Sequence, residues 1–531
     1  MIRYGGLFVP ALAALLCAWP ASRGHAGWWI ASAGFGLLAI VALWDLFQPW
    51  HNLRRNYPLI SRMRWYIEAI RPELRQYLFE SDTDGRPFSR EQRELIYERA
   101  KGANDKHPFG TKHDVYAGGY EWIEHSIAPK EKTDDSFRID IGGPECTKPY
   151  SASVYNISAM SFGSLSPNAL RAMNLGAKTG GFFHDTGEGG VSPYHLEHGG
   201  DLVWEIGSGY FGCRDANGHF DAGQFSETAQ LDAVKMIEIK LSQGAKPGHG
   251  GVLPGAKVTE EIARTRKVPA WQDCVSPAAH SAFSTPTGLL EFVARLRDLS
   301  GGKPTGFKLC IGDPVEFLGI VKAMRDTGIR PDFIVIDGGE GGTGAAPLEL
   351  TNRVGLPLRE GLLSAINALV GGDVRDGIRV GASGKAVSGF GLASNMALGA
   401  DWCNSARGFM FAVGCVQSVN CHTDKCPTGV ATQNPRRWRA IDVERKAARV
   451  ARFHKETVGA LATLVAVAGF EHPQSLTPKQ LLRRDLDGSV RNAAQRYELL
   501  DRGALLLEPP LPWQPLWEAA SADRFRPDRV A

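Results

Sequence analysis

The chain has 531 residues, enough for one large domain or for two to three smaller ones. Its net charge of +3 gives no reason to expect a polyanionic partner such as a nucleic acid. Its 9 cysteines are too few for a secreted disulfide scaffold, and several are clustered, so we expect the main body to lie in a reducing compartment.

The first fifty residues differ from the rest of the chain. Residues 7–21 are apolar, and residues 28–44 form an apolar, uncharged run long enough to span a bilayer. The basic residues that follow place the next segment in the cytoplasm by the positive-inside rule; they are Arg54, Arg55, Arg62 and Arg64. We therefore expect a transmembrane hairpin over residues 1–50, in the inner (cytoplasmic) membrane, with the main domain facing the cytoplasm. The alternative is a cleaved signal peptide followed by one anchor.

Residues 51–140 are expected to form a helical N-terminal segment. Apolar residues recur at a spacing of three to four over residues 68–79 and 89–101. Ser89 with Gln92 resembles a capping box at the start of the second helix. The segment carries no obvious chemistry.

From about residue 150, short β-rich runs alternate with longer helical patterns such as residues 289–299, 314–327 and 388–398. The eight candidate strands cover residues 153–157, 182–185, 202–206, 236–240, 306–310, 333–336, 378–380 and 402–404. This alternation predicts a closed (β/α)8 TIM barrel over residues 141–440. A doubly wound open sheet is the alternative, but no G-x-G-x-x-G turn follows an early strand.

Residues 441–531 are expected to form a helical C-terminal segment and tail. Residues 442–468 show an uninterrupted helical pattern. The Pro-rich stretch from Pro509 onward is expected to be extended or disordered.

Three cysteines lie within a dozen residues just after the eighth candidate strand. Cys415, Cys421 and Cys426 are spaced C-x5-C-x4-C, and Pro427 follows the last of them. Three thiolates in one loop suit a soft metal centre, and a proline after the last cysteine is common in iron–sulfur sequences. Three ligands suit a three-iron cluster, or a four-iron cluster with one outside ligand. The alternative is a loop with three structural cysteines.

Glycine-rich runs fall at the ends of the candidate strands, where the function of such a barrel resides. They let a backbone approach a planar or anionic ligand closely, and the last two loops resemble the phosphate-binding loops of barrels. A flavin mononucleotide (FMN) is the simplest ligand with one phosphate and a flat ring; ordinary barrel turns are the alternative. The candidate cofactor-binding residues are Ala159, Met160, Ser161, Asp185, Lys246, Gly338, Gly339, Ser383, Gly384, Lys385, Arg407 and Gly408.

Lys246 and Glu188 are the candidate catalytic residues, because each lies in a glycine-rich loop at a strand end. Lys246 would bind a substrate carboxylate or the flavin edge, and Glu188 would bind an amine or imine. His249 and His280 are weaker candidates for proton donors. A cluster in the cysteine loop would pass electrons singly to the flavin, which then delivers a hydride.

The region from about 150 to 435 resembles the FMN-binding synthase domain of glutamate synthase. The matching segments, in order, are SAMSFGSLS from Ser158, TGEGG from Thr186, QGAKPG from Gln243, LPGAKV from Leu253, GGTGAAP from Gly341 and the C-x5-C-x4-C-P-x-GVATQ run from Cys415.

That resemblance implies a (β/α)8 barrel that holds FMN and a three-iron, four-sulfur (3Fe-4S) cluster on Cys415, Cys421 and Cys426. It implies that ammonia adds to 2-oxoglutarate and that the resulting imine is reduced to glutamate, with electrons from a ferredoxin-like or NAD(P)H-oxidising donor. By the same resemblance, Lys246 and Glu188 match positions at the flavin and 2-oxoglutarate site.

The chain departs from the family pattern at several positions. Asp185 stands where the family has Asn, His249 and Val252 where it has Glu and Gln, and Tyr210 where it has Arg. The family's amidotransferase domain is expected to be missing, and the apolar hairpin is an addition. We therefore expect a membrane-anchored, glutamate synthase-like oxidoreductase acting on CH-NH2 donors. The alternatives are another FMN barrel oxidoreductase with a different acceptor and a non-catalytic membrane electron-relay subunit.

Overall fold

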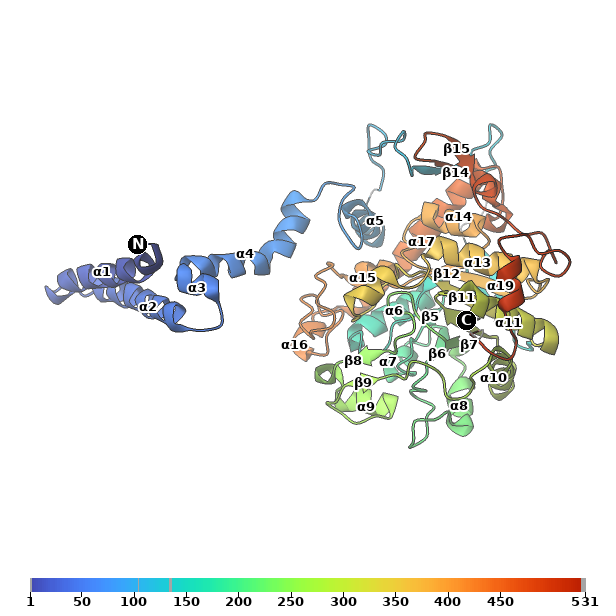
Figure 1. Ribbon diagram of the computed structural model, residues 1–531, viewed down its shortest axis with the longest axis horizontal. Helices are drawn as coiled ribbons and strands as arrows, with labels where there is room; N and C mark the ends of the chain where they lie inside the picture. Colours follow the sequence, from blue (N-terminus) through green and yellow to red (C-terminus); the bar gives the residue numbers. More distant parts are fainter. Residues whose placement is uncertain (1, 104, 133–135, 527–531) are drawn as a thin grey trace. The chain divides into compact units, whose positions relative to one another are not determined.

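The computed structural model describes residues 2–103, 105–132 and 136–526, and the chain divides into two compact units, Met1–Arg86 and Pro87–Ala531 (Figure 1). In the first unit, α1 (Ile2–Ser22) packs against α2 (Trp28–Phe47), and the Ser32 hydroxyl donates to the Ala14 carbonyl at 2.9 Å. Tyr4–Ser22 and Trp28–Phe47 are each long and apolar enough to cross a membrane, although a signal sequence has the same properties. They are candidate membrane spans.

After α2 the first unit continues with short helices, and an arginine from one of them pairs with a buried aspartate of α2. Asp45, near the end of α2, is fully buried and pairs with Arg62 at 2.7 Å. The helices that follow are α3 (Asn52–Asn56), α4 (Ile60–Leu74) and the π-helical turn η1 (Arg75–Phe79).

The second unit begins with α5 (Arg90–Lys101), and its capping box of Ser89 and Gln92 is confirmed. Helix ends there, however, and the expectation of a helical segment up to residue 140 is wrong beyond Lys101. The described residues of the remainder contain β1 (Glu121–Ile123) and β2 (Arg138–Ile141). These strands are short and depend on distant partners, β14 (Leu481–Arg484) and β3 (Tyr150–Ser153).

The predicted closed barrel is confirmed. Eight parallel strands pair in sequence order and the last pairs with the first, through Cys403↔Tyr155, Asn404↔Asn156 and Ser405↔Ile157. The barrel strands are β4 (Tyr155–Ile157), β5 (His184–Asp185), β6 (Leu202–Ile206), β7 (Val234–Lys240), β10 (Thr305–Leu309), β11 (Phe333–Asp337), β12 (Arg379–Ser383) and β13 (Trp402–Ser405). Each matches one of the eight expected segments, except that residue 153 belongs to β3 and not to β4.

Helices cover the barrel because a parallel sheet buries both of its faces. Side-chain caps define many of their starts: Ser166 accepts from the backbone of Ala169 before α6, and Asp442 accepts from that of Arg445 before α17. The helices of this unit after α5 are α6 (Pro167–Gly180), α7 (Pro193–Leu196), α8 (Ala222–Ala229), α9 (Glu260–Arg266), α10 (Pro286–Leu299), α11 (Pro314–Thr327), α12 (Leu348–Arg353), α13 (Leu358–Gly371), α14 (Gly389–Ala397), α15 (Arg407–Val413), α16 (Pro435–Trp438), α17 (Val443–Val467), α18 (Ala493–Arg496) and α19 (Gln514–Ala519).

An excursion after β7 carries β8 (Val252–Leu253), the 3-10 turn η2 (Gly255–Lys257), α9 and β9 (Cys274–Val275) before the chain reaches α10. β8 and β9 form a two-stranded antiparallel ribbon. In an ordinary barrel unit a strand leads directly to its helix. The additional residues here extend one side of the barrel beyond the carboxyl ends of the strands.

The C-terminal segment is less helical than expected. α17 matches the predicted helix, but the 3-10 turns η3 (Pro473–Ser475) and η4 (Pro478–Gln480) follow it, and β14 and β15 (Val490–Asn492) form a sheet with β1. The described part of the tail contains α19, which packs against α11, so the expectation of an extended or disordered stretch from Pro509 is wrong there.

Candidate functional site

A cavity of about 540 Å³ opens at the carboxyl ends of the barrel strands. Its lining comes from the loops after β4, β5, β7, β11, β12 and β13, from the excursion after β7, and from Phe88 just before α5. This volume lies within the range of roughly 300–1,000 Å³ typical of sites for small molecules and cofactors. It is the place where barrel enzymes carry their active sites.

Most of the residues chosen from the sequence meet at this cavity. Those that line it are Ala159, Met160, Ser161, Glu188, Lys246, Ser383, Gly384, Lys385, Arg407 and Cys421. Those that lie behind the lining are Asp185, Gly338, Gly339, Gly408, Cys415 and Cys426. The structure therefore brings the loops of five strands and one cysteine to a single site.

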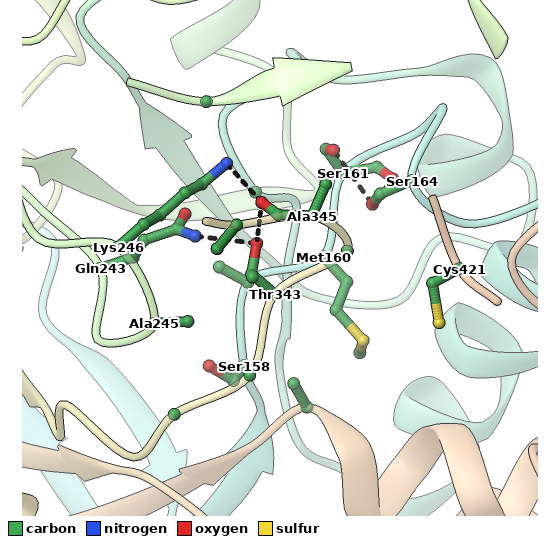
Figure 2. Close-up of a pocket in the computed structure, with 18 of the residues that line it drawn as sticks. Ser158, Met160, Ser161, Ser164, Gln243, Ala245, Lys246, Thr343, Ala345 and Cys421 are labelled. Atoms are coloured by element: carbon green, nitrogen blue, oxygen red, sulfur yellow. Dashed lines mark hydrogen bonds between the residues drawn. The ribbon is translucent and has the colours of Figure 1, made fainter. Parts of the chain in front are cut away.

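Lys246 and Glu188 both face the cavity, but they are not paired with each other. The Lys246 ammonium donates to the Ala345 carbonyl at 3.1 Å (Figure 2). Glu188 pairs instead with Lys240, at the end of β7, at 3.0 Å. Burial lowers the pKa of Lys246, as does the charge of Lys240, while Glu188 raises it. Burial alone would raise the pKa of Glu188, but Lys240, with Arg266 and Lys246 nearby, lowers it to about 2.

Arg266, the last residue of α9, is a buried cation in the cavity wall that the sequence reasoning missed. Its side chain donates to the Ser161 hydroxyl at 3.1 Å and to the Phe162 carbonyl at 2.9 Å. Its Nε has no partner, and no carboxylate pairs with Arg266 among the residues that the structure describes. A buried guanidinium with spare donors is suited to bind an anion such as a carboxylate.

Lys308 of β10 lies at the floor of the cavity in a group of buried acids, which we call the barrel charge cluster. Lys308 contacts Glu205 directly and pairs with Glu238 at 3.0 Å and with Asp185 at 3.9 Å. Burial raises the pKa of Asp185 to about 7, and burial also raises the pKa of Glu238. One cation among three carboxylates means that the cluster holds at least one proton near neutral pH.

The loops after β12 and β13 supply two cations on another side of the cavity. Lys385 lies over the Phe88 ring, 6.0 Å from its centroid, and has a positive φ of 51°. Arg407 donates to the Thr343 carbonyl at 2.6 Å, which ties the loop after β13 to the loop after β11. The Ser383 and Ser158 hydroxyls lie 3.2 Å apart between these loops. The pair of cations and the hydroxyls suit an anionic group such as a phosphate.

The three cysteines of residues 415–426, which we call the cysteine loop, lie close enough to influence one another. The pKa of Cys415 is raised to about 11, mainly by burial and also by the neighbouring Cys421 and Cys426, although the Gln417 backbone N–H lowers it. Burial also raises the pKa of Cys426, but hydrogen bonds from Thr428 and from backbone N–H groups bring it below its usual value. Backbone donors aimed at sulfur suit thiolates that bind a metal cluster.

Cys421 connects this loop to the cavity. In Figure 2, Lys246 and Gln243 lie on one side of the view and Cys421 on the other, with Met160 between them. The Lys257 ammonium fixes the junction, because it donates to the carbonyls of Ser164 at 3.0 Å and of Cys421 at 3.3 Å. Burial lowers the pKa of Lys257 to about 8.

The weaker candidates lie outside the main cavity. His249 lines a small second cavity beside Glu188 and Lys240, and its ring contacts the Gly250 carbonyl at 2.8 Å. His280 is buried between the Tyr210 hydroxyl, at 3.1 Å, and the Lys240 carbonyl, at 2.9 Å. Neither His249 nor His280 is among the residues that line the main cavity.

Comparison with known proteins gives one consistent result. A family description, the conserved region in glutamate synthase, matches residues 136–471. The glutamate synthase large subunit-like protein YerD of Bacillus subtilis is 37% identical over 497 residues, which are 86% of this chain and 94% of that protein. The archaeal glutamate synthase (NADPH) of Methanocaldococcus jannaschii is 33% identical over 321 residues, 60% of each chain.

The relatives differ in how much of them this chain covers. The glutamate synthase (NADPH) large chain of Bacillus subtilis is 33% identical over 289 residues, which are 53% of this chain but 18% of that protein. The chain thus spans nearly all of YerD and a minor part of the large chain.

Proposed function

Because the chain belongs to the glutamate synthase family of oxidoreductases, we propose that it reduces an imine, 2-iminoglutarate formed from 2-oxoglutarate and ammonia, to an amino acid. The observation that carries the proposal is the set of charged residues that line the cavity. Two buried cations, Lys246 and Arg266, face it together with Glu188, which stays ionised. The substrate has the matching charges: carboxylates and a nitrogen that becomes cationic.

The residues around the cavity fit FMN. Lys385 and Arg407 would hold the phosphate, the 159–161 segment would contact the flavin ring, and Lys308 would favour negative charge on that ring. When bound, FMN supplies hydride-transfer chemistry. The Phe88 ring closes the wall beside Lys385 and keeps water from that side.

The cysteine loop fits an iron–sulfur cluster with three protein ligands. Cys415, Cys421 and Cys426 would hold it as thiolates, with the hydrogen bonds to Cys415 and Cys426 favouring the charged form. We propose the three-iron, four-sulfur form. The proximity of Cys421 to the cavity supports a role in passing electrons from a ferredoxin-like or NAD(P)H-oxidising donor.

The protein's own groups have distinct roles in this proposal. Arg266 and Lys246 bind the carboxylates of the acceptor and so orient its carbon–nitrogen bond. Glu188 stabilises the iminium cation and does not donate a proton, because its pKa of about 2 keeps it ionised. Burial lowers the pKa of Lys246, which makes its ammonium a better proton donor to the nitrogen of the product. In balance, 2-oxoglutarate, ammonium, two electrons and two protons give glutamate and water.

A different acceptor is the second candidate, and Val252 favours it. This apolar side chain lies in the cavity wall, so an acceptor with an apolar group at this point would bind better than one with a polar group there. The cofactors and the roles of Lys246 and Glu188 would be unchanged.

We also propose that α1 and α2 anchor the enzyme as a hairpin in the inner membrane, with the second unit in the cytoplasm. The support is the length and polarity of Tyr4–Ser22 and Trp28–Phe47 and the arginines that follow them.

Anaerobic purification of the full chain tests the proposal. We expect flavin absorption, about three irons per chain, and glutamate formation when reduced ferredoxin, 2-oxoglutarate and ammonium are supplied. Protein with both cofactors but no glutamate would remove 2-oxoglutarate as the acceptor and favour the second candidate. Protein without flavin and iron under these conditions would refute the oxidoreductase site itself.

A further inference from the structure

Residues just before α5 contact the cysteine loop, although they lie more than 300 positions earlier in the chain. The Gln417 side chain makes two hydrogen bonds to the backbone of one residue: it accepts from the Phe88 N–H at 3.1 Å and donates to the Phe88 carbonyl at 3.3 Å. Arg93, buried in α5, donates to the same carbonyl at 2.9 Å. Both polar groups of the Phe88 backbone are therefore used to hold one loop residue.

A second contact from α5 reaches a proposed ligand itself. The Tyr97 hydroxyl donates to the Cys415 carbonyl at 2.7 Å. The Phe88 and Tyr97 rings both pack edge-on against Phe411, with centroids 5.3 and 5.9 Å away. One contact lies at Phe88, just before α5, and the other at Tyr97, within α5, so together they fix the orientation of the loop as well as its distance.

The loop needs such restraint because its backbone is unfavourable at three places. Gln417, Val419 and Asp424 all have positive φ, at 55°, 58° and 60°. A β-branched residue such as Val419 rarely adopts this conformation, and it persists only when the surroundings enforce it. Asp424 is held by the Thr432 hydroxyl at 2.7 Å through its carbonyl. Gln417 is held by Phe88.

The conformation of Gln417 has a chemical consequence. Its backbone N–H donates to the Cys415 sulfur at 3.4 Å. Hydrogen bonds to the sulfurs of an iron–sulfur cluster tune its reduction potential, because they stabilise the more negatively charged reduced state. The side chain of Gln417 fixes the conformation that aims this N–H.

We propose that Phe88 and Gln417 form a clamp that positions the Gln417 N–H against the Cys415 sulfur and thereby sets the reduction potential of the cluster. The start of α5 is then a positioning element of the redox site, not a linker between units. This inference rests on the proposed function, because it requires the cluster.

The test is the reduction potential of the iron–sulfur centre in the full-length protein, measured by electron paramagnetic resonance during a redox titration. Gln417→Met keeps the length of the side chain and removes both bonds to Phe88. We expect iron and flavin content like wild type and a more negative potential. Loss of iron with flavin retained would also support the clamp, because the loop would then fail to present its thiols.

Two further variants make the result decisive. Tyr97→Phe keeps the ring and removes the hydroxyl that donates to the Cys415 carbonyl. It should shift the potential in the same direction, and it decides the question if Gln417→Met does not fold. Arg452→Met is the matched control, because Arg452 holds the other end of α5 through the Ala100 carbonyl at 3.2 Å. It should leave the potential unchanged.

The outcomes separate the two proposals. A wild-type cluster whose potential is the same in Gln417→Met and Tyr97→Phe would overturn the clamp alone. An equal shift of the potential in Arg452→Met would also overturn the clamp, because any change in how α5 packs on the rest of the unit would then shift the potential. Wild-type protein without iron would overturn the cluster of the proposed function and the clamp with it.

Discussion

Replacing Lys308 by methionine removes the one cation at the centre of the barrel charge cluster. Lys308 is 3% exposed and contacts Glu205, Glu238 and Asp185, which are each 2% exposed or less. Removing one partner of a buried ion pair costs roughly 3–5 kcal/mol, because an uncompensated charge remains in a low dielectric. We expect a loss of this size in the free energy of unfolding of the flavin-free protein, read from urea denaturation midpoints.

The loss should depend on pH in a defined direction. The folded-state pKa of Asp185, about 7, lies above its ordinary value of 3.8, so the folded state binds more protons than the unfolded state between these pH values. Stability from this group is full below about pH 4 and falls as pH rises to about 7. Without Lys308 the carboxylates hold their protons more tightly, so the gap between variant and wild type should be small near pH 5 and large near pH 8.

The matched control is Lys235→Met, which removes a partly exposed lysine paired with the exposed Asp232 at 3.3 Å. Such surface pairs contribute about 0–1 kcal/mol, with little dependence on pH. The double variant Lys308→Met, Glu238→Gln should recover part of the loss. A loss in Lys308→Met that is equal at pH 5 and pH 8, or larger at pH 5, would refute the charge reasoning.

Three other substitutions have defined outcomes. Serine in place of any one cysteine of the cysteine loop should abolish the iron signal while flavin remains. The control Cys213→Ser, at a buried cysteine outside the loop, should keep both iron and flavin. Iron retained in a loop variant would exclude the substituted cysteine as a ligand. Arg266→Met should raise the KM for a carboxylate acceptor by about 10-fold to 100-fold, because a lost hydrogen bond to a charged group costs about 1.5–3 kcal/mol. The flavin content should be unchanged. An unaltered KM would contradict carboxylate binding by Arg266. Glu188→Gln should lower kcat equally across pH 5–9, because Glu188 has a pKa of about 2 and does not titrate in that range. If the variant instead lost one limb of the plot of kcat against pH, Glu188 would have to transfer a proton.

The barrel could be predicted because its signals are local. Each strand is a short β-rich run ended by glycine or polar residues, and helices such as α11 and α17 carry their own caps and apolar periodicity. Strands β1, β2, β14 and β15 were missed because each has three or four residues and becomes a strand only beside a distant partner. The helix α19 was missed because the prolines around it suggested an extended chain.

The candidate site could be predicted where chemistry and glycine-rich loops coincide in sequence. Glu188 and Lys246 stand in such loops, whereas Arg266 and Lys308 stand in a helix and a strand with ordinary composition. What makes the latter two notable is burial beside groups from other strands, which no local pattern encodes. Lys240 is a similar case, since its pairing with Glu188 depends on the closure of the barrel.

The small sheet of β1, β14 and β15 has a consequence for the order in which the chain folds. Glu121 of β1 lies opposite Arg483 of β14, so β1 is synthesised long before its partner. Until the C-terminal segment leaves the ribosome, β1 has an unpaired edge, and its short length and charged residue limit the risk of aggregation at that stage. Since synthesis is N-terminal first, this sheet can form only after all eight barrel strands have been made. Protection of the β1 amides from hydrogen exchange would therefore report that synthesis and folding have both reached completion.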